Sequence, residues 1–394
     1  MNAVVPKGWC PSLTQPMRSG DGLLVRVKPP GAVVPAAAAR ALADAAAQDG
    51  NGTIELTNRA SLQVRGLRAE TVQHFVATMV AARLAHNEPE VEHRRRVITA
   101  PLAGDDPGVS RHAATVAADL EAMLMREARL AALPSKFGFL VDGGGVLPVR
   151  AVSADTRVTL DGDACVVTAD GAEMGEACEP LEAAAVVARM ALDFIDYPAG
   201  SPRRMRDLAT ATATALPVAA PNAVGWLPYQ SLRRGAFGVG LPFGVVDRTA
   251  LAALADVSER FGDGTLRVTP WRALAIPGVT EPDAVHEAVA ALGLIAVPTD
   301  PRVRMFACPG RPACPSATVA TRADAMLLAE PGFAGTLHVS GCAKGCAHAT
   351  PADVTLVGEA GRYDLVLGGR PTDAPTWRGV TVAQAAVLLR GIVA

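Results

Sequence analysis

Four of the seven cysteines in this 394-residue chain form two close pairs near its carboxyl end. Five residues separate Cys308 from Cys314, and three separate Cys342 from Cys346. Four thiolates make a soft, anionic ligand set, which suits an iron–sulfur cluster or zinc and excludes hard cations. Structural zinc sites usually use tighter cysteine knuckles. The spacing therefore favours a 4Fe-4S cluster, with zinc or a disulfide as the alternatives.

Small residues and prolines surround both cysteine pairs, in the stretches Ala307-Cys-Pro-Gly-Arg-Pro-Ala-Cys-Pro315 and Ser340-Gly-Cys-Ala-Lys-Gly-Cys-Ala-His348. Such residues let the backbone wrap closely around a buried group and direct amide N–H groups at sulfur. His338 and His348 flank the second pair, and imidazole can ligate a mononuclear iron beside a cluster. The alternative is that each histidine only donates a hydrogen bond near the site.

Several separated motifs resemble those of the nitrite and sulfite reductase superfamily and, within it, of the precorrin-3B synthase family. Besides the cysteine arrangement, they are Lys7-Gly-Trp-Cys-Pro-Ser12, Ser135-Lys-Phe-Gly-Phe139, Val141-Asp-Gly-Gly-Gly145 and Ser340–His348. The resemblance extends over nearly the whole chain. It implies an α+β protein with a pseudo-duplicated, reductase-like fold of two ferredoxin-like half-domains and two α/β segments.

The same resemblance implies an iron–sulfur oxidoreductase, a monooxygenase of cobalamin biosynthesis. Its substrates would be the tetrapyrrole precorrin-3A and O2, its product the hydroxylated γ-lactone precorrin-3B, and its electron donor a protein that the sequence does not identify. A mononuclear non-haem iron or sirohaem would accompany the 4Fe-4S cluster. Two other functions stay open: a sirohaem nitrite or sulfite reductase, in which Cys346 bridges cluster and haem, and a non-catalytic zinc- or tetrapyrrole-binding protein.

Basic residues carry the implied substrate site. The stretch Thr57-Asn-Arg-Ala-Ser-Leu-Gln63 is similar to one that contacts the tetrapyrrole in the superfamily, which implies substrate contacts for Arg59 and Gln63. The same matching places Arg95 and Lys136 with Arg59 among the anion-binding catalytic residues and sets Gly144 against the macrocycle. Arginine and lysine suit this role, because a precorrin carries acetate and propionate arms that accept charge-assisted hydrogen bonds.

Simpler interpretations apply to some of these residues. The run Arg94–Arg96 could be solvent-exposed, since charge runs usually face water. Val141–Gly145 could be a plain β-turn, and Cys10 could be a buried structural thiol rather than a cap on the site. We expect Cys165 and Cys178, which lack metal-ligand spacing, to be structural.

One position departs from the sulfite reductase pattern. Where those enzymes carry a second lysine two residues after the first, this chain has Gly138. Reduction of a small oxyanion needs several positive donors around it. The glycine therefore favours a larger substrate.

The elements that must position these residues occur twice. We expect a strand at Gly22–Val27, a helix over 35–48, strands at 53–57 and 62–65, and a helix over 69–84; the plan recurs with a helix over 248–261 and strands at 265–269 and 273–276. Thr53 and Thr265, Thr57 and Thr269, and Gly66 and Gly278 all differ by 212 positions. An internal duplication follows.

The duplication divides the chain into four expected segments. They are ferredoxin-like half-domains at 13–85 and 222–290, a basic α/β segment at 89–205 and a cluster-bearing α/β segment at 300–394. Between the α/β segments we align Leu133–Gly138 with Leu337–Cys342. The uncharged stretch 208–232 contains three prolines and is predicted to be a linker leading into a strand.

Composition limits the remaining choices. The 37 basic and 39 acidic residues nearly balance, so nothing predicts a nucleic-acid or membrane partner. Residues 1–20 lack a signal-peptide pattern, from which we expect a cytoplasmic protein. An odd number of cysteines in that reducing compartment favours metal ligation over disulfides. We further expect a monomer.

Overall fold

The computed structural model describes residues 10–197, 204–208, 218–230, 233–329 and 333–392. They form two compact units. The larger takes in residues 10–17 and Leu24–Ala296, and the smaller residues 18–23 and 297–392. The division into four segments is finer than these two units and stays a prediction.

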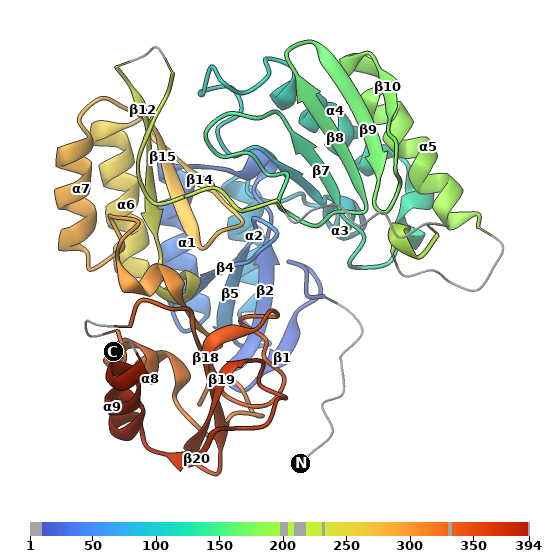
Figure 1. Ribbon diagram of the computed structural model, residues 1–394. Coiled ribbons are helices and arrows are strands. Elements are labelled where there is room, and N and C mark those ends of the chain that lie inside the picture. Colours follow the sequence, from blue (N-terminus) through green and yellow to red (C-terminus); the bar gives the residue numbers. More distant parts are fainter. Residues whose placement is uncertain (1–9, 198–203, 209–217, 231–232, 330–332, 393–394) are drawn as a thin grey trace. The chain divides into compact units, whose positions relative to one another are not determined.

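Apart from residues 18–23, the larger unit contains two copies of a ferredoxin-like arrangement (Figure 1). The first consists of β2 (Gly22–Val27), β3 (Val33–Pro35), α1 (Ala36–Asp49), β4 (Thr53–Leu56), β5 (Leu62–Leu67) and α2 (Val72–Ala81), with β1 (Met17–Ser19) next to β2. The second consists of β11 (Gly225–Pro228), β12 (Gly235–Gly240), β13 (Val245–Asp247), α6 (Arg248–Phe261), β14 (Thr265–Val268), β15 (Ala273–Val279) and α7 (Pro282–Ala291).

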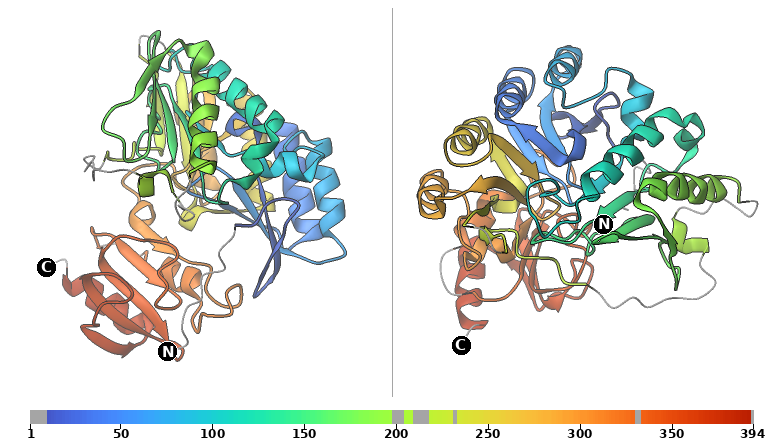
Figure 2. Two further views of the ribbon diagram at one scale, coloured as in Figure 1. Left: turned by 90° about the vertical axis from the view of Figure 1, so that its right-hand side faces the viewer. Right: turned by 90° about the horizontal axis from the view of Figure 1, so that it is seen from above.

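The two copies exchange one strand each. β13 pairs with β4, with Val246 opposite Ile54, and β3 pairs with β14, with Val34 opposite Leu266. The sheet orders are therefore β1-β2-β5-β4-β13 and β11-β12-β15-β14-β3. Because the exchanged pairs are related by the 212-position offset, the exchange is reciprocal. Figure 2 shows the helices α2, α1, α6 and α7 side by side in one row.

Unusual backbone angles repeat at the same offset. Gly31 has φ 58° and ψ 17°, and Phe243, 212 positions later, has φ 56° and ψ 18°. Gly66 and Gly278 have φ 73° and 77°. A left-handed conformation costs a non-glycine residue such as Phe243 roughly 1–2 kcal/mol, so it persists only where the surrounding architecture requires it. The expected internal duplication is confirmed.

An α/β segment follows the first ferredoxin-like copy. It contains α3 (Pro89–Arg94), β6 (Val97–Thr99), α4 (Ala113–Arg126), β7 (Phe139–Asp142), β8 (Thr156–Asp161), β9 (Ala164–Ala169), β10 (Glu176–Cys178) and α5 (Ala183–Ile195). The sheet order is β10-β9-β8-β7-β6, in which β6, β7 and β8 are parallel and the other pairs antiparallel. α4 and α5 pack on the sheet through an apolar core that includes Phe137, Phe139 and Phe194.

The smaller unit repeats this sheet. Its elements are β16 (Met305–Ala307), α8 (Thr321–Leu327), β17 (Leu337–Ser340), β18 (Ala352–Glu359), β19 (Arg362–Gly369), β20 (Trp377–Val380) and α9 (Val382–Ile392). The order is β16-β17-β18-β19-β20, again with three parallel strands followed by antiparallel ones.

The register of these sheets corrects one expected alignment. β7 begins at Phe139 opposite Val97, as β17 begins at Leu337 opposite Met305. Leu337 therefore corresponds to Phe139 and not to Leu133. The expected alignment is wrong because Leu337–Ser340 form a strand, whereas residues 133–138 form the loop before the corresponding strand.

Several predicted elements are confirmed in place. β2 and α6 have the predicted bounds, whereas α2 is shorter than the predicted helix over 69–84 and is followed by Arg83 at φ 58°. Of the predicted linker at 208–232, residues 209–217 and 231–232 lie outside the described residues, and β11 is the strand it leads into. No helix in the described part of the chain is long and apolar enough to cross a membrane.

Substitution of Gly66 tests how tightly the first copy is built. An added Cβ would lie 2.8 Å from the Asn51 backbone nitrogen, at a residue with φ +73°. We expect Gly66→Ala to lower the free energy of unfolding by about 2–4 kcal/mol, since strain and overpacking add. Gly104→Ala, at φ +86° with nothing within 4 Å, isolates the strain and should cost about 1 kcal/mol. Denaturant midpoints measure both, and equal losses would contradict the packing argument.

Candidate functional site

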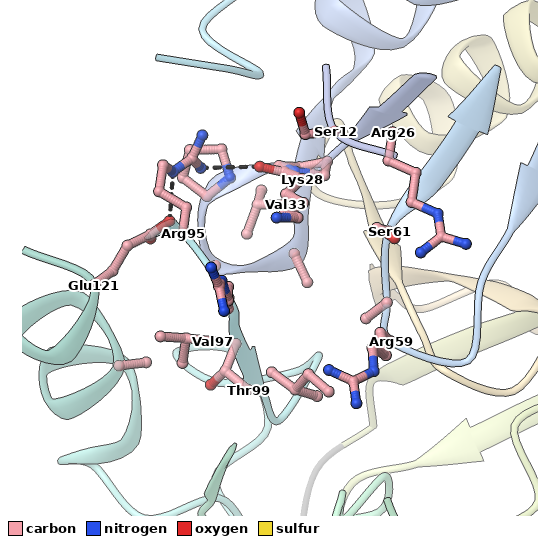
Figure 3. A pocket seen from close by; sticks show the side chains of 18 of the residues that line it. Ser12, Arg26, Lys28, Val33, Arg59, Ser61, Arg95, Val97, Thr99 and Glu121 are labelled. Atoms are coloured by element: carbon pink, nitrogen blue, oxygen red, sulfur yellow. Dashed lines mark hydrogen bonds and ion pairs between the residues drawn. The ribbon is translucent and has the colours of Figure 1, made fainter. Parts of the chain in front are cut away.

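A cavity of about 520 Å³ in the larger unit has an unusually basic wall. Its lining comes from β2 and the residues after it, the turn between β4 and β5, β6, α4 and the loop before β7. The cations that line it are Arg26, Lys28, Arg59, Arg95, Arg96, Lys136 and Arg267. Glu121 is the one carboxylate among the described lining residues. Figure 3 shows the labelled side chains around the cavity.

Carboxylates already balance the charge of Arg95. Its guanidinium lies 2.7 Å from Glu92 and 2.6 Å from Glu121, and it donates a third hydrogen bond of 2.9 Å to the Lys28 carbonyl (Figure 3). Arg95 is only 4% exposed. The structure thus brings Arg95 to the cavity wall, where it ties α3, α4 and the end of β2 together and holds the Lys28 backbone.

Arg96 retains an unsatisfied donor. Its Nε donates to the His93 carbonyl at 3.1 Å and its Nη1 to the Pro134 carbonyl at 2.8 Å, whereas its buried Nη2 has no hydrogen-bond partner among the described residues. Burial and the neighbouring Arg59 lower the pKa of Arg96 to about 10. A buried guanidinium N–H without an acceptor is costly, which makes Arg96 a donor suited to an anionic ligand.

The solvent-exposed interpretation of the arginine run is wrong. Arg94 is 7% exposed, and its guanidinium donates to the carbonyls of Leu124 and Met125 in the last turn of α4. Arginine is favoured there because it satisfies carbonyls that have no partner inside the helix. The three consecutive arginines therefore differ in role: Arg94 binds the end of α4, Arg95 is paired with carboxylates, and Arg96 retains a donor for a ligand.

Lys28 is a cation of the cavity wall that the sequence analysis did not predict. Burial lowers the pKa of Lys28 from 10.5 to about 8. Attraction to Glu92 opposes this shift, and repulsion from Arg96 and Arg95 offsets part of that attraction. Thr99, another residue of the cavity lining, is 5% exposed, and its hydroxyl has no hydrogen-bond partner in the described part of the chain. The sequence offered one signal for Lys28: it lies two residues after Arg26, and residues two apart in a strand face the same side.

Arg59 projects from the turn between β4 and β5 into the cavity (Figure 3). A hydrogen bond of 2.7 Å between the Thr57 and Ser61 hydroxyls closes that turn. Arg59 Nη2 donates to the Lys136 carbonyl at 2.8 Å, and no carboxylate of the described residues forms a hydrogen bond or ion pair with it. Burial, followed by repulsion from Arg204, lowers its pKa. Lys136 itself is exposed on the lining of the cavity.

Two predicted substrate contacts lie elsewhere. Gln63 does not line the cavity; it accepts a bond of 3.1 Å from Arg26 Nε and donates one of 2.6 Å to Glu55, so it orients Arg26. Gly144, at φ 79°, lines a different hollow of about 870 Å³ formed by the loops at 104–111, 142–144 and 159–163.

The four clustered cysteines belong to the smaller unit. Cys308 directly follows β16, and Cys342 lies two residues after β17. Because these strands are parallel neighbours, both cysteine loops leave the same edge of the sheet. Partial desolvation raises the pKa of Cys346 against the opposing effect of Lys344, and the Cys308, Cys342 and Cys314 thiols raise it further, so the four thiols are close enough to interact.

The cysteine loops fit a multi-iron cluster in three respects. The Gly341 N–H donates to Cys308 Sγ at 3.2 Å, and amide donors of this kind stabilise cluster sulfur. An added Cβ on Gly341 would lie 2.6 Å from the Ala317 Cβ, so the loops pack too closely for a side chain there. All four residues are free soft donors. Among the described residues, no three His, Cys, Asp or Glu side chains lie in a group that could hold a metal ion as they stand.

His338 lies beneath the second cysteine loop as an unsatisfied buried imidazole. It is 0% exposed, and neither ring nitrogen has a hydrogen-bond partner within the described chain. Its ring centroid lies 5.8 Å from that of His348, which contacts Phe306. Burial and His348 lower the pKa of His338 to about 4, so the ring is neutral.

The remaining cysteines differ in their surroundings. Cys10 is partly exposed and lines the basic cavity, so the buried structural interpretation is wrong for it. Cys165 and Cys178 are register partners on β9 and β10, with Sγ atoms 3.7 Å apart in the apolar core. Burial and Cys178 raise the pKa of Cys165 to about 12, which keeps that thiol protonated and unreactive.

Comparisons with known proteins agree with this architecture. Residues 15–82 and 233–293 match the nitrite/sulfite reductase ferredoxin-like half domain. The solved structure of the Mycobacterium tuberculosis NirA protein superposes with a TM-score of 0.66 at 20% identity, covering 94% of this chain and 80% of that one. The expected fold class is confirmed.

One relative is similar over almost the entire chain. A Sinorhizobium precorrin-3B synthase is 33% identical over 398 residues, which cover 95% of this chain and 85% of that protein. By contrast, the haemoprotein β-component of a Cronobacter sakazakii sulfite reductase is 33% identical over 138 residues, or 31% of this chain and 24% of that protein. A Mycolicibacterium paratuberculosis ferredoxin sulfite reductase is 32% identical over 36% of this chain.

The lowered pKa of Lys28 predicts a pH dependence of anion binding. An anion favours charged Lys28, so binding above about pH 8 must be accompanied by proton uptake. The affinity for mellitate, a planar polycarboxylate, should therefore fall as pH rises from about 7 to 9, while the arginines stay charged. Lys28→Arg should flatten this decline and Lys136→Arg should preserve it. Titration calorimetry at several pH values measures the effect, and a decline unchanged in Lys28→Arg would contradict it.

Proposed function

The chain belongs to the precorrin-3B synthase family, and we propose from this premise that it converts precorrin-3A to precorrin-3B in an oxygen-dependent reaction. The reaction consumes O2 and a reductant, hydroxylates the tetrapyrrole and closes a γ-lactone. Its product is then ready for ring contraction in aerobic cobalamin biosynthesis. In line with the sequence-based expectation, we place this activity in the cytoplasm.

The observation that carries the proposal is the basic cavity with its unsatisfied donors. Among the described residues, the guanidinium groups of Arg59 and Arg96 are held by backbone carbonyls alone, and Arg96 Nη2 has no acceptor. The acetate and propionate arms of a precorrin supply carboxylates for these guanidinium groups. Lys28 and Lys136 add point charges from the neighbouring wall. These residues would therefore bind and orient the macrocycle through its rim.

The cysteine loops support an iron–sulfur cofactor. Cys308, Cys314, Cys342 and Cys346 would hold a 4Fe-4S cluster, with the Gly341 N–H donating to Cys308 Sγ. Such a cluster, when bound, supplies electrons one at a time. We further propose that a separate electron-donor protein reduces it, and that mononuclear iron or sirohaem is the second redox centre.

Turnover measurements test the proposed reaction. Anaerobically purified protein with a chemical reductant should consume O2 with precorrin-3A and yield a product of the mass of precorrin-3B. Sulfite and nitrite reduction should be absent under matched conditions. Turnover of sulfite or nitrite without precorrin oxidation would instead identify a sirohaem reductase. A protein without iron, sulfide or haem on chemical analysis, and without turnover, would identify the non-catalytic alternative.

Cysteine substitutions test the cofactor separately from the reaction. Serine at position 308, 314, 342 or 346 should abolish or bleach the iron–sulfur absorbance, because a hard alkoxide is a poor cluster ligand. Cys178→Ser, outside the set, should keep wild-type iron and sulfide content. Equal cluster content in all five variants, measured by iron and sulfide analysis, would exclude these ligands.

A further inference from the structure

We propose that Gly138 determines which ligand the basic cavity accepts, because its missing side chain leaves room for the Arg59 guanidinium beside the Lys136 carbonyl. An ideal Cβ built on Gly138 would have three nearest neighbours, all of them atoms of that guanidinium: Nη1 at 3.1 Å, Cζ at 3.7 Å and Nη2 at 3.9 Å. Arg59 therefore fills the space that a side chain at 138 would take. The inference rests on the proposed function, since it concerns recognition of substrate carboxylates.

The backbone of Gly138 cannot move away to accommodate a side chain. Its N–H donates to Asp155 Oδ2 at 2.9 Å, and its carbonyl accepts from the backbone N–H groups of Asp155 and Thr156 at 2.8 and 3.3 Å. Both of its polar groups are thus bound to the start of β8. Asp155 is 0% exposed and also accepts from Arg204 Nε and the Met205 N–H, at 2.8 and 2.9 Å.

Arg59 is the partner that must yield. Its position relative to Lys136 depends on one hydrogen bond of 2.8 Å, from Nη2 to the Lys136 carbonyl. Arginine has several rotatable bonds, so its head group shifts at lower cost than a backbone bound on both sides. A residue larger than glycine at 138 should therefore displace the guanidinium from the cavity wall.

The consequence is a choice between two kinds of cation. With glycine at 138, the charge at this place comes from a planar guanidinium, which binds carboxylates with two parallel hydrogen bonds. A lysine at 138 would replace that fork with a flexible point charge and push Arg59 aside. The structure therefore favours substrates with carboxylate arms over small oxyanions at this position.

A double-mutant cycle tests this coupling, with uroporphyrin, a stable porphyrin with acetate and propionate arms, as the probe. Arg59→Ala should raise the dissociation constant about tenfold to a hundredfold. Gly138→Ala should raise it about two- to fivefold and Gly138→Val at least about tenfold, as the displacement grows. In the Arg59→Ala background, neither Gly138 variant should change it by more than about twofold. Fluorescence quenching gives the constants.

Controls separate this effect from general destabilisation. Gly391→Ala, where an added Cβ meets no atom of the described residues within 4 Å, should leave uroporphyrin binding unchanged. A crystal structure of Gly138→Val should show the Arg59 guanidinium displaced from its place beside the Lys136 carbonyl, while the backbone hydrogen bonds between residue 138 and Asp155 persist. Equal weakening by Gly138→Val with and without Arg59, or an unmoved Arg59, overturns the inference. If the wild-type protein does not bind uroporphyrin, that result contradicts the proposed function instead. The crystal structure of the Gly138 variant then still shows whether a side chain at position 138 displaces Arg59.

Discussion

The basic cavity depends on arginines that are held by carbonyl oxygens. Arg59 binds the Lys136 carbonyl, and Arg96 binds those of His93 and Pro134. A carbonyl fixes the direction of a guanidinium without cancelling its charge, whereas a carboxylate does both. Arg95 shows the contrast, because Glu92 and Glu121 neutralise it and it stays in the wall. The loops that supply these carbonyls must therefore be placed accurately, which is the task of the surrounding sheets and helices.

Concentrated positive charge opposes folding unless a ligand or a distant carboxylate offsets it. The lowered pKa values of Lys28 and Arg96 express that cost, since burial and mutual repulsion both disfavour the charged forms. Favourable interactions elsewhere in the protein must offset this cost. The pairing of β3 with β14 and of β13 with β4 provides some of them. A polycarboxylate that enters the cavity relieves the repulsion, so binding and folding are coupled.

The sequence predicted what depends on local pattern. Helix α6 and strand β2 follow from periodicity, and the cysteine pairs follow from residue type and spacing. It could not show which of Arg94, Arg95 and Arg96 is paired with carboxylates, because that depends on Glu121, which reaches Arg95 from another helix. The role of Gln63 between Arg26 and Glu55 was hidden for the same reason.

The duplicated sheets show where the two α/β segments diverge: the loops after the first two parallel strands carry cysteines in one segment and none in the other. By strand register, Ala100 occupies the place of Cys308, and each donates its backbone N–H to the neighbouring parallel strand, at Val141 and Val339 respectively.

By the same register, Gly144 corresponds to Cys342. The triple-glycine turn therefore stands where the other segment has a cysteine loop, and it lines an open hollow rather than the basic cavity. The shared architecture explains why this turn resembles a substrate-contacting motif. A tight turn that leaves the edge of a parallel sheet needs glycine, both in the segment with the cysteine loops and in the segment without them. One backbone plan thus supports two chemistries, and the side chains placed at equivalent turns decide between them.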